Sequence, residues 1–375
     1  MQIRIILTTI IDNINFGTYL QAYATVSIFQ KKECTIDVLN YIRPYLTGKT
    51  YAQNYLKQKN KPLPIRYLYF SSYLLLNSFM IWQVKRFLKQ RVTLTERFNS
   101  LDEIIKKLRP YDLYLTGSDQ VWNSEHNFGV DKVFFWEGIS KKKAAYGASI
   151  GIKHFPKEQQ PLIRHLLSDY KKISVRECSN IQTLAEIGIK NAVQVLDPTL
   201  LLKKEDWISV SRHHFKKKVP YLLIYSVETQ RNSTVINIAK EIAVRRNLAV
   251  YLVCPTFKFN SQFKIDKIFN CASVEMFLSL FEQADYIVVS SFHGTAFAIN
   301  FNKQFVTVSP ERFSTRVNSL LQLFHLENQY ISNKEQIPDK EIDYTRVNQI
   351  LEIERCKSES FIDDIINIAN QQMTI

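Results

Sequence analysis

Glycine is scarce in this sequence. Nine glycines occur in 375 residues, where ordinary usage near 7% would give about 26. A chain so poor in glycine is expected to keep it where the backbone needs a conformation or a close approach that a side chain would obstruct. Five of the nine lie in the loops that carry the polar motifs described below: Gly17, Gly117, Gly147, Gly151 and Gly294. These loops are therefore favoured places for a functional site.

Cysteine is sparse too, and its spacing weighs against a structural metal site. The five cysteines are scattered along the chain, and no two form a CxxC pair. This pattern argues against a zinc site and favours reduced thiols, as in the cytoplasm. The first residues enter an apolar strand directly and do not resemble a secretion signal. We therefore expect a cytoplasmic protein.

Acidic residues are too few to balance the basic ones, and the formal net charge is +14. Nucleic acid, a membrane surface and small anionic substrates all attract such a chain, and a lysine-rich solvated surface explains the charge equally well. The sequence contains no zinc finger, helix-turn-helix signature or RNP-type strand, which weighs against nucleic acid. With 46% hydrophobic residues the chain can bury a core, so disorder is not favoured.

Short apolar runs alternate with predicted helices in two series along the chain. The first series opens with IRIILTTI and closes with AVQVLD, and the second opens with YLLIYSV and includes DYIVVSS. Such alternation is typical of parallel sheets covered by helices on both faces. We predict two doubly wound, Rossmann-like α/β domains with the active site in the cleft between them. The predicted parts are residues 1–205, residues 206–345 and a C-terminal helix over 346–375.

An insert over about residues 43–97 interrupts the first series. It is aromatic, basic and predicted to be largely helical, and it contains YLYFSSYLLLNSFMIW at residues 67–82. That run is short and broken by serines, so it makes a poor transmembrane span. An aromatic helix with a basic continuation suits the interface of an anionic membrane. A helical hairpin packed on the first domain explains the same pattern.

The stretch DYIVVSSFHGTAFAINFNKQF, residues 285–305, passes from a buried strand directly into a helix. The corner predicts a strand that ends at Ser291 and a helix that starts near Gly294, which together favour a bound phosphate or carboxylate. His293 on this corner can serve as a cationic ligand or a proton donor near neutral pH. Thr295 can cap the helix or touch the ligand. The alternative is a histidine that is hydrogen-bonded inside the sheet edge.

The segment TGSDQVWN, residues 116–123, also follows a buried strand. Ser118 and Asp119 present short polar groups there, and Asp119 can act as a general base on a hydroxyl. Trp122 offers a flat face suited to a sugar. The alternative for Asp119 is an Asx turn or a helix N-cap.

Three further strand ends carry polar residues. Asn15 and Gly17 lie between the first strand and the first helix, a loop that commonly contacts ligands in doubly wound folds. Arg176 ends the strand ISVRE, and its planar guanidinium suits phosphate or carboxylate, although an ion pair with the adjacent Glu177 explains it too. Asp197, in VLDPTLLL, is interpreted as part of a plain turn.

In order along the chain, NFGTYLQAYA, YLTGSDQVWN, AAYGASIG, ISVRE, VLDPTLLL and SSFHGTAFAINFNKQFVTV resemble the polysaccharide pyruvyl transferase family. The resemblance implies a glycosyltransferase-B-like (GT-B-like) fold. It also implies transfer of the enolpyruvyl unit of phosphoenolpyruvate onto a sugar, often as a pyruvate ketal in a cell-surface glycan. Arg176 and His293 match the family's arginine and histidine that hold the donor or act on it. Many members carry an arginine where this chain has Ser291, and we expect Arg312 or Arg316 to supply that cation.

The chemistry of phosphoenolpyruvate assigns roles to these residues. Protonation of its methylene carbon creates an oxocarbenium-like centre that a sugar hydroxyl attacks, so an acid and a base are needed. We assign His293 as the acid or a phosphate ligand, Asp119 as the base and Arg176 as the group that neutralises the donor. Further donor contacts are expected from Ser291, Gly294, Thr295, Arg312 and Arg316, and acceptor contacts from Asn15, Gly17, Ser118 and Trp122. We expect no cofactor and no metal.

The acceptor is expected to be a lipid-linked sugar at the cytoplasmic face of the membrane, which would give the insert a purpose. Three other functions are compatible with parts of the pattern. A glycosyltransferase of the same fold could use a nucleotide-sugar donor, and a non-catalytic protein could bind glycan or membrane. An RNA-binding protein is disfavoured because aromatic residues are not interleaved with the polar sites.

Overall fold

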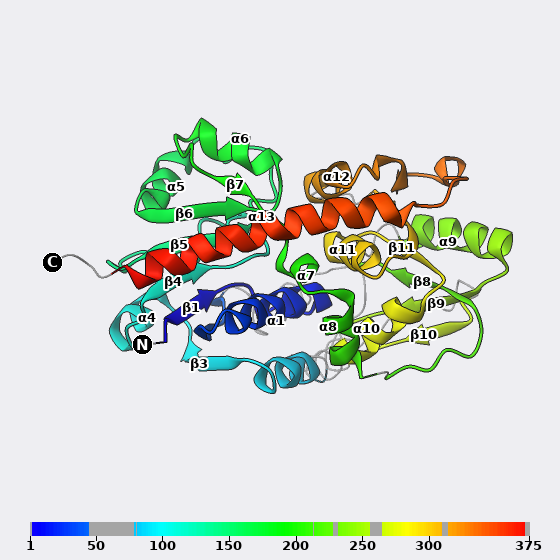
Figure 1. Ribbon diagram of the computed structural model, residues 1–375, viewed down its shortest axis with the longest axis horizontal. Helices are drawn as coiled ribbons and strands as arrows, with labels where there is room; N and C mark the ends of the chain where they lie inside the picture. Colours follow the sequence, from blue (N-terminus) through cyan, green and yellow to red (C-terminus); the bar gives the residue numbers. More distant parts are fainter. Residues whose placement is uncertain are drawn as a thin grey trace, which may run out of the picture.

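The computed structural model describes residues 2–44, 79, 81–212, 214–227, 232–255, 265–309 and 314–371. Within them the chain forms two parallel β-sheets (Figure 1). The first has the order β3-β2-β1-β4-β5-β6-β7 and the second β10-β9-β8-β11-β12-β13. In both sheets the order reverses next to the first strand of the series, between β1 and β4 and between β8 and β11. Ligands bind at such reversal points in doubly wound sheets.

The strands of the first sheet are β1 (Arg4–Thr8), β2 (Thr35–Tyr41), β3 (Thr93–Phe98), β4 (Leu113–Thr116), β5 (Lys143–Ala148), β6 (Tyr170–Val175) and β7 (Val193–Gln194). Those of the second are β8 (Tyr221–Tyr225), β9 (Ala249–Val253), β10 (Lys267–Phe269), β11 (Tyr286–Val289), β12 (Gln304–Val308) and β13 (Tyr330–Ile331). Every residue of β4, β5, β8 and β11 is buried. Central strands covered on both faces are continuously apolar, which is why the sequence reveals them clearly.

Helices cover both sheets. They are α1 (Phe16–Lys31), α4 (Leu101–Lys107), α5 (Gln160–Leu167), α6 (Ser179–Glu186), α7 (Pro198–Leu201), α8 (Lys204–Ser211), α9 (Asn232–Arg246), α10 (Val274–Gln283), α11 (Phe292–Asn300), α12 (Ser314–Leu323) and α13 (Tyr344–Asn370). Short 3-10 turns occur at η2 (Lys132–Phe135), η3 (Glu327–Gln329) and η4 (Lys334–Gln336). The prediction of two doubly wound α/β sheets is confirmed.

The C-terminal helix α13 connects the two halves of the molecule (Figure 1). Near its start, the Tyr344 hydroxyl donates to the Ala298 carbonyl of α11 at 3.3 Å. From its middle onward, the Ser358 hydroxyl accepts from the Leu196 amide at 2.9 Å and Phe361 packs against Tyr146 of β5. Near its end, the Ala369 carbonyl accepts from Lys142 Nζ, next to β5, at 3.3 Å. The helix therefore begins on the second sheet and finishes on the first. The domain boundaries at residues 205 and 345 stay predictions.

Most of the predicted insert, including all of residues 45–78, lies outside the described residues. The insert was predicted to be largely helical over about residues 43–97. Residues 81–89 are helical, but the last part of the insert forms the strand β3 instead. β3 pairs in parallel with β2 and forms an edge of the first sheet. Its sequence TLTERF is polar because most of β3 is not buried, so it lacks the apolar run of a central strand. Within the described residues, no helix is long and apolar enough to cross a bilayer.

Candidate active site

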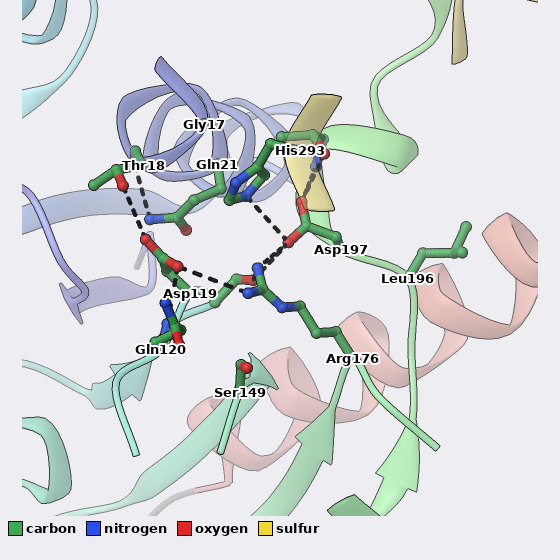
Figure 2. A network of polar contacts seen from close by, with 12 residues as sticks. Gly17, Thr18, Gln21, Asp119, Gln120, Ser149, Arg176, Leu196, Asp197 and His293 are labelled. Carbon is green, nitrogen blue, oxygen red and sulfur yellow. Dashed lines mark hydrogen bonds and ion pairs between the residues drawn. The ribbon is translucent and has the colours of Figure 1, made fainter. Parts of the chain in front are cut away.

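Residues that follow the carboxyl ends of both sheets meet around one carboxylate oxygen, Oδ2 of Asp197 (Figure 2). Arg176 Nη1, after β6, lies 2.8 Å from it. Ser118 Oγ, after β4, donates to it at 2.8 Å. His293 Nε2, after β11 of the second sheet, lies 3.8 Å away. The arginine and the histidine that the sequence singled out therefore converge, and Asp197 is the group that joins them.

Arg176 is held by three carboxylates. Besides Asp197, its Nε donates to Glu177 at 2.9 Å, and Nη2 lies 3.7 Å from Asp119 Oδ1. Its guanidinium also lies over the ring of Phe292, 4.2 Å from the centroid. Burial lowers the pKa of Arg176, but the three carboxylates raise it more, so the pKa lies above its ordinary value and the group stays charged. The ion pair with Glu177 is thus present, and a contact of Arg176 with the donor stays a prediction.

Asp119 is fixed in an uncommon backbone conformation. Its φ is 71°, which is rare for a residue other than glycine. Its carbonyl accepts from the Ser149 amide at 3.0 Å, and its Oδ2 accepts from the Thr18 hydroxyl of α1 at 3.0 Å. Burial raises the pKa of Asp119, but Arg176 and other nearby cations outweigh it and hold the pKa at about 2. Asp119 is therefore an ionised carboxylate at neutral pH.

His293 occupies the first turn of α11, two residues after the N-cap Ser291. Its ring packs on Gly17 of α1, where an added Cβ would lie 2.1 Å from Nδ1. Burial, helped by the charge of Arg176, lowers the pKa of His293 to about 4, against the opposing pull of Asp197. A cationic role for His293 near neutral pH therefore requires a bound anion that raises this pKa, and its predicted roles as ligand or proton donor stay predictions.

The other residues of the His293 corner have structural partners. Ser291 Oγ accepts from the Gly294 amide at 3.2 Å and caps the helix. Thr295 Oγ1 bonds to the Ser291 carbonyl and to Thr307 Oγ1, at 3.0 and 2.9 Å, and is buried. A Cβ on Gly294 would lie 2.8 Å from a methyl of Val289, so glycine allows the helix to start this close to β11. Their predicted donor contacts stay untested.

Two predicted acceptor residues lie inside the protein. The Trp122 ring is 2% exposed, stacks on Phe135 at 5.7 Å between centroids, and donates its Nε1 hydrogen to the Phe134 carbonyl at 3.2 Å. It cannot be the sugar platform that we predicted, because its surface is used in the core. Ser118 is also fully buried and is committed to Asp197. Both residues are part of the buried structure that supports the site.

The loop after β1 supplies the remaining acceptor candidates. Asn15 Oδ1 caps α1 by accepting from the Gly17 amide at 3.0 Å, and it also accepts from the Tyr225 hydroxyl of β8 at 3.1 Å. Asn15 therefore contacts β8 of the second half, and Gly17 contacts His293 of α11 in the same half. This places the N-terminus of α1 directly at the junction of the two halves.

Arg316, on α12, acts on the site through its charge. It contributes to lowering the pKa of Asp119 and His293, and also that of His126, which burial brings to about 4. Burial raises the pKa of Glu177, and the charge of Arg316 opposes that rise. The expectation that Arg316 supplies the cation missing at Ser291 stays a prediction. Arg312 lies outside the described residues.

Sequence reasoning missed two residues of the site. Asp197 was interpreted as a turn residue, and it does cap α7 by accepting from the Thr199 amide at 3.0 Å, but its second oxygen joins Arg176 and His293. Gln21 was not considered, although it lies one helical turn after Gly17 on the same face of α1. The signal available for Gln21 was a side-chain amide among the mostly apolar buried positions of α1.

A model of the family described as polysaccharide pyruvyl transferase matches residues 15–312. No curated protein matches the chain. Among solved structures, the S. aureus MnaA–UDP co-structure has 12% identity and a TM-score of 0.54, with 98% of each chain covered. A candidate UDP-N-acetylglucosamine 2-epimerase from Listeria monocytogenes has 10% identity and a TM-score of 0.51, with 96% of this chain and 91% of that chain covered.

At such identities these structures establish only the fold, which is the expected GT-B-like pair of Rossmann-like domains. The family model spans all the motifs of the site, from Asn15 through Asp119, Arg176 and Asp197 to His293. This chain therefore belongs to the polysaccharide pyruvyl transferase family.

Proposed function

We propose that this protein transfers the enolpyruvyl unit of phosphoenolpyruvate onto a sugar of a cell-surface polysaccharide or its lipid-linked precursor and closes it to a pyruvate ketal. One observation carries the proposal: Arg176 and His293, from opposite sheets, share Asp197 at the junction of the two domains. Membership of a transferase family supports the reaction class. Phosphoenolpyruvate as the donor, the ketal product and independence of any metal or cofactor are parts of the proposal.

The proposed reaction balances without an oxidant. The methylene carbon of phosphoenolpyruvate takes up a proton, and one sugar hydroxyl attacks the resulting oxocarbenium-like carbon while losing its own proton. The C–O bond to phosphate then breaks, and a second hydroxyl of the same sugar attacks and loses its proton. One of the two hydroxyl protons replaces the one added to carbon, and the other leaves with the phosphate.

The residues of the site suit these steps. Asp119, ionised with a pKa of about 2, can accept a hydrogen bond from a sugar hydroxyl and stabilise the positive charge that develops at the reacting carbon. Arg316 supplies the cation for the donor. When the trianionic donor binds, its charge will raise the pKa of His293, so the imidazole becomes protonated and serves as the acid.

The test is direct. Purified protein is incubated with phosphoenolpyruvate and a panel of lipid-linked sugars, and inorganic phosphate and product mass are measured. Release of phosphate together with a sugar that has gained one pyruvate ketal supports the proposal. Absence of both with every sugar tested, under conditions where phosphoenolpyruvate binds, would point to another reaction.

A glycosyltransferase with a nucleotide-sugar donor is the alternative. Its support is the likeness in fold to a protein solved with UDP. Binding of UDP with the affinity of a substrate, and no binding of phosphoenolpyruvate, would favour this alternative.

We also propose peripheral contact with the cytoplasmic face of the membrane, where a lipid-linked acceptor would lie. Two aromatic side chains before the end of the insert are exposed, Phe79 at 48% and Trp82 at 54%, and their rings stack at 6.0 Å. The Arg86 guanidinium lies over Trp82 at 5.4 Å. Exposed aromatic rings beside a basic group suit the interface of an anionic membrane.

A further inference from the structure

Three buried polar atoms around Asp197 and Asp119 have no hydrogen-bond partner within the described residues: Oε1 of Gln21, Nη2 of Arg176 and Nε2 of His293. Gln21 is fully buried, and the other two residues are more than nine-tenths buried. Buried polar atoms are normally paired, so three such atoms at one place indicate a position for a ligand atom.

The network around Gln21 fixes which end of its amide faces the site. Nε2 donates to Thr9 Oγ1 at 2.8 Å and to the Thr18 carbonyl at 3.0 Å. A flipped amide would place Oε1 against that carbonyl, so the donor end must point there. The acceptor Oε1 is therefore the free end. Figure 2 shows the Gln21 side chain extending from α1 into the space bounded by Asp119, Arg176 and His293.

The protein atoms at this position include both a hydrogen-bond donor and a hydrogen-bond acceptor. Arg176 Nη2 can only donate, Gln21 Oε1 can only accept, and His293 Nε2 can do either according to its tautomer. A phosphate or carboxylate oxygen only accepts, so it would satisfy Arg176 but would face Gln21 Oε1 without a hydrogen between them. It would also meet Asp119, Glu177 and Asp197, three carboxylates around a single guanidinium. A hydroxyl both donates and accepts, and it is neutral.

We infer that this position holds the reacting hydroxyl of the sugar acceptor. When the sugar binds, the hydroxyl oxygen accepts from Arg176 Nη2 and its hydrogen is donated to Gln21 Oε1. The Asp119 carboxylate, 3.7 Å from the same Nη2, lies beside it and takes over this hydrogen when the hydroxyl attacks and loses its proton. Gln21 is then a residue that binds the acceptor, and Arg176 serves the acceptor side where the sequence suggested the donor side. This inference rests on the proposed function and names the substrate group that occupies its centre.

The first test measures the effect of one substitution on each of the two substrates separately. Gln21→Met keeps the length of the side chain and removes both amide functions, and Gln329→Met, at a buried glutamine of η3, is the matched control. The KM of the acceptor and the dissociation constant of phosphoenolpyruvate are measured for each variant. We expect Gln21→Met to raise the acceptor KM about tenfold, the effect of one hydrogen bond in a buried site, and to leave the phosphoenolpyruvate affinity within about twofold. If Gln21→Met weakens the binding of both substrates equally, or leaves the acceptor KM unchanged, the inference is overturned.

A second measurement uses the unaltered protein and does not depend on a folded variant. Methyl glucoside, methyl galactoside and methyl mannoside are compared, in binding experiments, with analogues in which single hydroxyls are O-methylated, because a methyl ether still accepts but cannot donate. For at least one hydroxyl, methylation should abolish binding. If every methyl ether binds as well as its parent sugar, the inference is wrong. Failure of phosphoenolpyruvate to bind while the hydroxyl dependence holds would overturn the proposed donor and leave the hydroxyl position standing.

Discussion

Gly17 and His293 touch across the two halves of the molecule, so closely that a Cβ on Gly17 would lie 2.1 Å from Nδ1 of the imidazole. Gly17 is helical, and alanine at such a position would ordinarily stabilise the helix by about 1 kcal/mol. Any loss caused by Gly17→Ala must therefore come from displacement of His293.

We expect Gly17→Ala to lower the free energy of unfolding and to reduce activity at least tenfold. The double variant Gly17→Ala/His293→Ala removes the clash and should be more stable than Gly17→Ala alone, as measured by urea unfolding. If the second substitution recovers no stability, the close approach of Gly17 and His293 does not account for the loss in free energy of unfolding.

Arg176 is the counter-charge for three buried carboxylates, so its removal should be costly. We expect Arg176→Met to destabilise the protein by about 3–5 kcal/mol, because it leaves buried charges uncompensated. Without the guanidinium, burial should raise the pKa of Asp119 and Asp197 above their unfolded values and raise further that of Glu177, which is already above its ordinary value. The destabilisation should therefore be greatest at high pH and should shrink as the carboxylates become protonated. Urea unfolding at pH 8 and pH 5 measures this. Arg245→Met, on an exposed arginine, should show neither effect.

His293 and His126 make stability depend on pH. Burial brings both pKa values to about 4 from the ordinary 6.5. Between these pH values the unfolded chain binds more protons, so stability is complete above about pH 6.5 and falls as the pH drops towards 4, by about 2–3 kcal/mol for each histidine. Asp119, with its pKa of about 2, contributes stability that is lost only below this range. Unfolding of His126→Gln/His293→Gln should show a much flatter profile, and an equally steep one would contradict the assignment.

Binding of phosphoenolpyruvate should take up a proton. The donor brings negative charge towards His293, whose pKa will rise from about 4. At pH 6, calorimetric titrations in buffers with different ionisation enthalpies should give uptake of a fraction of a proton for each donor bound. The uptake should vanish in His293→Gln. Uptake that persists in this variant would assign the proton to another group.

Phe79 and Trp82 should govern binding to membranes. We expect the protein to co-sediment with vesicles that contain anionic phospholipid and to do so much less with neutral vesicles, because charge and aromatic insertion act together. Phe79→Ser/Trp82→Ser should weaken sedimentation about tenfold or more. The exposed aromatic residue Phe128, 77% exposed, provides the control, since Phe128→Ser should have no effect. If the unaltered protein, Phe79→Ser/Trp82→Ser and Phe128→Ser all bind vesicles equally, the proposed membrane contact is wrong.

The sequence predicted the central strands and the loops that follow them, because buried parallel strands are apolar throughout and end in short polar segments. It did not predict β3, β10 or β13. β3 and β10 lack fully buried runs and β13 has only two residues, so apolar patterning is weak in all three.

At the site, the convergence of Arg176 and His293 was predictable because each follows a strand. The roles of Trp122 and Asp197 in the structure were not predictable. A tryptophan after a strand can stack on a ligand or fill the core. Only the position of Phe135 decides between these two for Trp122. The neutral state of His293 likewise depends on burial from all sides, which no local pattern encodes.

The course of α13 also bears on how the protein is made. Ser358 and Phe361 complete the surroundings of β5 and the loop after β7, yet all six strands of the second sheet separate them from β7 along the chain. During synthesis the first sheet must therefore wait, with part of its apolar surface uncovered, until the second sheet and α13 have left the ribosome. Truncation before this helix should leave a nascent half-protein that depends on chaperones, even though every strand of that sheet is present.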